Sequence, residues 1–176
     1  MGFIYVALFR CFLSPDRCIM EAIMPIEVNG VAPYVQVFDM KKSIHFYRDL
    51  LGFTVTGKSD PMSADADDVN WCMLELGPAC LMLNTAYDPD DVPAAPDAAR
   101  WSGHQDTCLF FGCPDVDAAY QHLLAQGLTP NPPKVAWYGM KQLYLTDPDG
   151  FGICFQWRAT DDETKAARQV HASEAG

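Results

Sequence analysis

The sequence predicts an α+β fold in which one ordered set of elements, strand–helix–strand–strand–strand, occurs twice. Two observations lead to this prediction. Short stretches in which apolar residues alternate with period two, typical of strands with one buried face, flank each of two helical segments. Each helical segment begins after an aspartate and ends at a glycine, at a similar spacing (Asp39 to Gly52, Asp115 to Gly127). A set of elements that recurs in the same order is an internal repeat.

The first half, residues 31–86, predicts a strand, a helix and three further strands. Asp39 is expected to cap the helix, because its carboxylate can accept hydrogen bonds from the free amides of the first turn. Gly77 and Pro78 separate the last two strands and predict a tight hairpin. The four strands are expected at residues 33–38, 53–56, 71–76 and 79–84.

The second half, residues 105–158, predicts the same order again. A strand at 107–112 precedes the helix that Asp115 caps, and a proline-rich edge segment at 130–133 leads to a closing hairpin. The turn of that hairpin, Asp147-Pro148-Asp149-Gly150, matches a type I turn, since Asp, Pro and Gly stand where that turn favours them.

Three further segments complete the expected organisation. Residues 87–104 contain three prolines and four aspartates, which predicts a linker or lid without an element of its own. Residues 159–176 form a polar tail, frayed or partly helical. Residues 1–30 are expected to be an extension, either loosely attached or the result of an early start codon, with Met20 or Met24 as the alternative start. The apolar run at 1–9 lacks the basic start of a signal peptide and is too short to span a bilayer.

Charge and cysteine content limit the classes of partner. The net charge of −11 and the pI near 4.5 argue against nucleic acid and against an anionic membrane surface. Seven cysteines make an odd number without a Cys-x-x-Cys pair, which favours reduced thiols and a cytoplasmic protein over a disulfide framework. Otherwise the acidic composition indicates little beyond solubility.

The strand patterns place aromatic, amide, thiol and thioether side chains together on one side of the predicted sheets. Aromatic walls with a few amides suit a planar or amphipathic organic ligand. The alternative is that these side chains fill the interior or meet a partner subunit. Glu75 could act as a general base if buried, or be a solvated strand residue. The candidate ligand-binding residues are Tyr34, Gln36, Trp71, Met73, Glu75, Met82, Asn84, Cys108, Phe110, Gln142, Tyr144, Cys154 and Gln156.

The chain carries four motifs, Val35-x-Val37-x-Asp39 with Ser43, the segment 46–53, Asp115-Val116-Asp117-Ala118 and Asp147-Pro148-Asp149-Gly150. Together they resemble motifs of the vicinal oxygen chelate superfamily, which includes glyoxalase I, bleomycin-resistance proteins, fosfomycin-resistance enzymes and extradiol dioxygenases. The resemblance covers residues 31–158, and it implies two βαβββ modules, 31–86 and 105–158, that form a curled, cup-shaped mixed sheet around a cavity. It also implies a homodimer.

The resemblance also implies where metal ligands would stand, namely at Ala32, Met82, Cys108 and Cys154. Alanine and methionine cannot hold a hard divalent ion, and two thiols alone make a poor zinc site. We therefore expect no metal and no cofactor. Trp71-x-Met73-Leu74 and Trp137-x-Gly139-Met140 resemble the bleomycin-resistance branch, whose members bind ligand without metal.

Two functions follow as hypotheses. The first is metal-independent binding or sequestration of a small aromatic or amphipathic molecule, such as an antibiotic or a metabolite. The alternative is a metal-dependent enzyme on the same scaffold, a glyoxalase-like lyase or isomerase and less readily a dioxygenase, with His104 as an unconventional metal ligand or Glu75 as base. Whether any catalysis takes place stays open.

Overall fold

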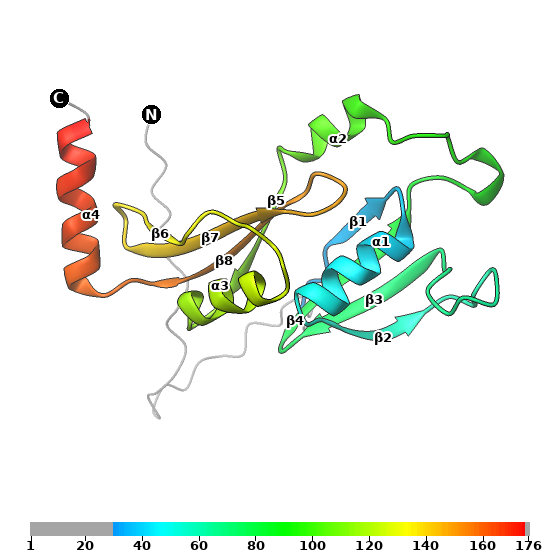
Figure 1. Ribbon diagram of the computed structural model, residues 1–176, viewed down its shortest axis with the longest axis horizontal. Coiled ribbons are helices and arrows are strands. Elements are labelled where there is room, and N and C mark those ends of the chain that lie inside the picture. Colours follow the sequence, from blue (N-terminus) through cyan, green and yellow to red (C-terminus); the bar gives the residue numbers. More distant parts are fainter. Residues whose placement is uncertain (1–29, 175–176) are drawn as a thin grey trace, which may run out of the picture. The chain divides into compact units, whose positions relative to one another are not determined.

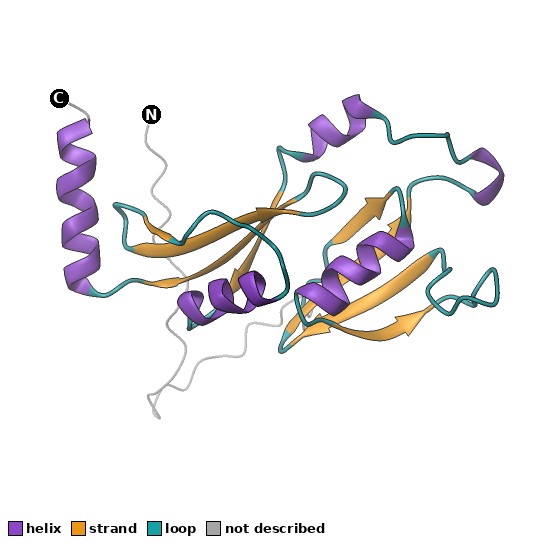
Figure 2. Cartoon of the chain, viewed as in Figure 1, coloured by secondary structure: helices purple, strands orange, loops and turns teal. Residues whose placement is uncertain are grey.

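The computed structural model describes residues 30–174 (Figures 1 and 2). The expected extension at 1–30 lies, up to residue 29, outside the described residues. Two βαβββ modules, each with its own four-stranded mixed sheet, confirm the predicted fold class. The strands are β1 (Tyr34–Val37), β2 (Thr54–Lys58), β3 (Trp71–Leu76) and β4 (Ala79–Thr85) in the first sheet, and β5 (Cys108–Gly112), β6 (Lys134–Val135), β7 (Met140–Thr146) and β8 (Gly152–Arg158) in the second.

The two sheets have the same topology. The strand orders are β1-β4-β3-β2 and β5-β8-β7-β6, and in each sheet the first strand pairs in parallel with the last while the other neighbours are antiparallel. In the predicted hairpin of the first module, Leu76 pairs with Ala79 across the turn. The internal repeat seen in the sequence is therefore a repeat of the fold.

The module helices begin at the predicted aspartates. Asp39 accepts a hydrogen bond from the Lys42 amide at 3.1 Å and starts α1 (Met40–Ile44), which continues as the π-helix η1 (His45–Leu50). Asp115 accepts from the Ala118 amide at 2.8 Å and starts α3 (Val116–Ala125). These contacts satisfy free amides of the first turn.

One core lies between the sheets and the module helices. It contains the alternate strand residues that the pattern predicted to be buried, among them Val37, Leu83 and Ile153, each with no exposed surface. Burial of such a side chain contributes about 1.5–3 kcal/mol to folding. Phe53 and Phe111 meet edge to face across the two modules, with ring centroids 5.7 Å apart. The opposite side of each sheet, here termed its open face, carries the remaining alternate residues.

The linker prediction was wrong in one respect, because residues 87–104 contain regular structure. A 3₁₀ turn, η2 (Pro89–Asp91), is followed by the helix α2 (Ala98–His104). Asp97 caps α2 by accepting from the Ala99 amide at 2.9 Å. The helix was not predicted because the prolines and aspartates before residue 97 are typical of a loop. The helix itself includes good helix formers such as alanine and arginine.

The polar C-terminal segment, expected to be frayed or partly helical, contains a helix. Helix α4 (Asp161–Glu174) begins with a capping box, in which the Thr160 amide donates to Glu163 Oε2 at 2.8 Å and the Glu163 amide donates to Thr160 Oγ1 at 3.2 Å. Within residues 30–174, no helix is both long enough and apolar enough to cross a membrane.

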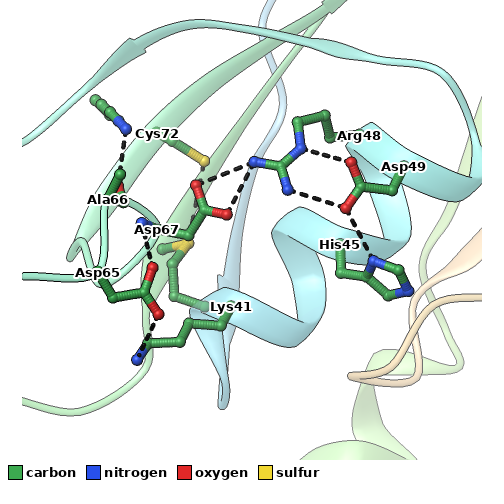
Figure 3. Close-up of polar contacts among 10 residues, drawn as sticks. Lys41, His45, Arg48, Asp49, Asp65, Ala66, Asp67 and Cys72 are labelled. Carbon is green, nitrogen blue, oxygen red and sulfur yellow. Dashed lines mark hydrogen bonds and ion pairs between the residues drawn. The ribbon is translucent and has the colours of Figure 1, made fainter.

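The acidic loop at residues 60–68 is tied to the helix of the first module (Figure 3). Arg48 donates to both oxygens of Asp67, at 3.0 and 2.9 Å, and also binds Asp49. Lys41 pairs with Asp65 at 3.0 Å. These carboxylates serve to anchor the loop, and the Arg48 guanidinium holds the pKa of Asp49 well below its usual range.

Candidate functional site

The predicted site residues fall into two groups, one on the open face of each sheet. None of them belongs to the hydrophobic core cluster, although Cys154 is fully buried and Gln142 is 7% exposed. The first-sheet group is Tyr34, Gln36, Trp71, Met73, Glu75, Met82 and Asn84, and the second-sheet group is Cys108, Phe110, Gln142, Tyr144, Cys154 and Gln156.

On the first sheet the register aligns these side chains in rows across three strands. Tyr34, Met82 and Met73 form one row, since β4 pairs with both β1 and β3 at Met82. Gln36, Asn84 and Trp71 form the next row in the same way. Tyr34 is 52% exposed, so an apolar and amphipathic surface remains open to solvent on this face.

Glu75 lies apart from these rows, toward the β3–β4 turn. It is exposed and accepts a hydrogen bond from Thr56 Oγ1 at 3.1 Å. Of the two alternatives that the sequence left for Glu75, its exposure favours a solvated strand residue over a buried general base.

On the second sheet an aromatic pair stands over a buried thiol. Phe110 and Tyr144 meet edge to face, with ring centroids 6.2 Å apart and planes at 88°, and both pair across the sheet with Cys154. Each ring is about half exposed, at 53% and 50%. Burial raises the pKa of the Cys154 thiol to about 11 and that of the Tyr144 hydroxyl to about 12, so both groups are protonated at neutral pH.

The amides on the open faces already have partners within the chain. Gln142 Nε2 donates to Gln156 Oε1 at 2.8 Å, and Tyr138 donates its hydroxyl proton to Gln142 Oε1 at 2.9 Å. On the first sheet, Gln36 accepts from Arg100 at 2.6 Å. Water or ligand is therefore not required to satisfy these glutamine oxygens.

Tyr138 and Arg100 are residues of these faces that sequence reasoning missed. Tyr138 precedes β7 in a turn that ends at Gly139, with φ of 89°, so strand alternation does not extend to it. Arg100 belongs to the segment that was predicted to have no element. Only the cap signal of Asp97 ahead of an alanine pair could have indicated a helix there.

The residues at the implied metal-ligand positions do not fit a hard divalent ion. Ala32 has no donor, Met82 offers a thioether, and burial raises the pKa of both thiols, Cys108 and Cys154. Nowhere in the described part of the chain do three or more His, Cys, Asp or Glu side chains gather so that they could hold a metal ion. The side chains at these positions therefore do not support a reaction step on a metal ion.

His104, which the sequence left as an unconventional ligand, has structural contacts instead. Its Nδ1 lies 2.7 Å from the Asp149 carbonyl oxygen, and because that oxygen can only accept, Nδ1 carries the proton. The ring stacks on Phe151 with centroids 4.0 Å apart. The residue thus fastens α2 to the turn of the closing hairpin.

The acids of the closing turn join the second module to the first. Asp147 accepts from the Tyr47 hydroxyl at 2.8 Å. Asp149 accepts from Ser43 Oγ at 3.1 Å and from the Phe38 amide at 2.7 Å. Both carboxyls are buried, and burial raises the pKa of each above its usual value. This turn, here termed the joint, therefore connects the second module to the first.

Comparison with known proteins places this geometry in a family. The chain matches the family described as Glyoxalase/Bleomycin resistance protein/Dioxygenase superfamily over residues 28–155. Because this match covers most of the chain, the protein belongs to that superfamily. A search of curated proteins finds no match.

Solved structures share the fold. TnmS3, an antibiotic binding protein from Streptomyces sp. CB03234, is 22% identical, with TM-score 0.55, over 76% of this chain and 99% of its own. A glyoxalase/bleomycin resistance protein from the same Streptomyces is 23% identical, with TM-score 0.50, over 72% and 97%. SMU.1112c is 26% identical, with TM-score 0.55, over 74% and 100%.

Proposed function

We propose that this protein binds and sequesters a small aromatic or amphipathic molecule, without a metal ion, on the open faces of its sheets. The observation that carries the proposal is the exposed edge-to-face pair of Phe110 and Tyr144, beside the hydrogen-bonded amides of Gln142 and Gln156. Aromatic rings left open to water offer area for a planar ligand, and a ring–ring contact is worth about 0.5–1.5 kcal/mol beyond that area. The antibiotic binding reported for TnmS3 agrees with this proposal.

The proposal also covers the oligomeric state, the cellular compartment and the residues that make up the binding unit. We propose a cytoplasmic homodimer, in which a second copy covers part of the open faces and completes the cup-shaped cavity that the family resemblance implies. The five described cysteines, all free thiols, agree with a reducing compartment. The binding unit is proposed to be residues 31–158, with modules 31–86 and 105–158.

A thermal-shift screen with planar aromatic compounds, among them neutral 2-naphthamide and aromatic antibiotics, tests the proposal. We expect binders to raise the melting temperature of protein prepared in the presence of a chelator. Tyr144→Ala should weaken a binder of the second face about tenfold, and Trp71→Ala a binder of the first face by a similar factor, since a stacked aromatic contact is lost.

Trp157→Ala is the matched control, because this ring is 42% exposed but lies on the opposite side of β8 from Gln156. It should leave the ligand-induced shift unchanged. Binding that survives both Tyr144→Ala and Trp71→Ala would overturn the proposal. So would stoichiometric metal in protein purified without chelator if His104→Ala removed it, and that result would favour the enzyme alternative.

A further inference from the structure

Arg100 brings a positive charge to the open face of the first sheet. It lies in α2, between the modules, and its half-buried guanidinium donates from Nη2 to Gln36 Oε1 at 2.6 Å. Gln36 is the β1 member of the row that continues through Asn84 to Trp71. The arginine therefore stands at one end of a polar and aromatic row on the proposed binding surface.

The fold fixes the position of Arg100, because α2 is docked and does not hang free. A Cβ atom at Gly150 would lie 2.6 Å from the Trp101 carbonyl oxygen, so only glycine allows α2 to approach the closing turn this closely. His104 adds its hydrogen bond to the Asp149 carbonyl and its stacking on Phe151. These three contacts hold the backbone that carries Arg100, so little further entropy of this segment is lost on binding.

The charge of Arg100 has no carboxylate partner in the described part of the chain. Two other half-buried cations are paired: Arg48 binds Asp67 and Asp49, and Lys141 binds Asp117 and Glu163. For Arg100 the single hydrogen bond found within residues 30–174 is to a neutral amide. A guanidinium has five N–H donors, so most of the donors of Arg100 remain available to a ligand.

Two carboxylates line the same small pocket as Arg100 but are occupied by other donors. Asp97 caps the first turn of α2, and Asp149 accepts from the Phe38 amide and from Ser43. The free space beneath α2 holds about one water molecule, so an aromatic ring does not enter there. A ligand would meet Arg100 from the open face, with its ring over the Trp71 end of the row.

We infer that Arg100 binds an acidic oxygen group of the ligand, so that the molecule recognised by the first sheet is an aromatic compound with a carboxylate. This inference rests on the proposed function and adds the chemical class of the ligand. A carboxylate would replace the Gln36 amide as the acceptor and form two parallel hydrogen bonds with the guanidinium, the geometry that arginine prefers.

Calorimetric titration of the full chain with 2-naphthoate and 2-naphthamide, which differ in charge but hardly in shape, tests this inference. We expect the wild type to bind the acid about tenfold more tightly than the amide, as a charge-assisted hydrogen bond at a half-exposed site provides. Arg100→Gln should remove this preference while changing the affinity for the amide less than about twofold. Lys165→Gln, an exposed change on α4 with the same effect on net charge, should alter neither affinity.

The outcomes separate the two proposals. Equal binding of acid and amide by the wild type, with both lost in Trp71→Ala, would overturn the inference and leave the binding function intact. A preference for the acid that persists in Arg100→Gln would do the same, as would an equal loss of both affinities in that variant. If neither probe binds the wild type, the inference fails, and the thermal-shift screen with other aromatic compounds decides the proposed function separately.

Discussion

The two modules end in equivalent hairpins, β3–β4 and β7–β8, whose turns have different roles. Gly77 and Pro78 of the first turn are exposed, and a side chain at Gly77 would meet nothing within 4 Å. The second turn, Asp147 to Gly150, is mostly buried and binds the helix of the first module. Repetition of a module thus provides the same fold twice, whereas of the two turns it is the second that binds the other module.

The largest expected difference between the turns concerns their glycines. Both have positive φ, 92° at Gly150 and 57° at Gly77, but only Gly150 lies against another segment. We expect Gly150→Ala to lower the free energy of unfolding by about 3 kcal/mol, from backbone strain plus the clash with Trp101, and Gly77→Ala by about 1 kcal/mol from strain alone. Urea denaturation measures both, and equal losses would show that the two turns are energetically alike.

The next largest effect concerns the Tyr47 hydroxyl, which donates a hydrogen bond to Asp147 in the second turn. Tyr47→Phe removes the donor to buried Asp147 and should cost about 1–3 kcal/mol of unfolding free energy, because a buried acceptor loses its partner. Tyr34→Phe serves as control, since Tyr34 is 52% exposed, and it should change stability by less than about 0.5 kcal/mol. Similar values for both variants would contradict the role assigned to the Asp147 contact.

A smaller effect is the pH dependence of the joint. Burial raises the folded-state pKa of Asp149 above the unfolded value near 3.9, so the folded state binds its proton more tightly. The stability that this provides is fully present below the unfolded pKa and is lost as pH rises through the folded pKa. Asp149→Asn does not titrate, so the stability of wild type relative to this variant should fall as pH rises through that window and then level off. A relative stability that rises with pH would contradict the assigned direction.

Local chemistry explains why the fold was predictable from sequence. Strand alternation and helix capping involve only a few neighbouring residues, so both can be recognised in the sequence. Examples are the alternation of Val35 and Val37 with Tyr34 and Gln36, and the capping residues Asp39 and Asp115. Helix α2 was missed because its short length gives no periodicity to detect, and proline-rich sequence precedes it.

The candidate site was predictable only in part. Strand alternation assigns side chains to one side of each sheet, but it does not say which of them find partners elsewhere. The contacts of Gln36 with Arg100 and of Gln142 with Tyr138 depend on a linker helix and on a turn, and neither follows from a period of two. Likewise the burial of Asp147 and Asp149 results from docking against residues about a hundred positions earlier, which a turn motif does not reveal.

The most direct test of ligand binding on the open faces is methyl NMR of protein labelled at methionine, titrated with 2-naphthamide. Met73 and Met82 lie on the open face of the first sheet, Met40 is in the core and Met62 is exposed in the acidic loop. We predict saturable shifts of the Met73 and Met82 signals, with Met40 and Met62 unchanged. Saturable binding that leaves Met73 and Met82 unperturbed and shifts Met62 instead would contradict binding on the first open face.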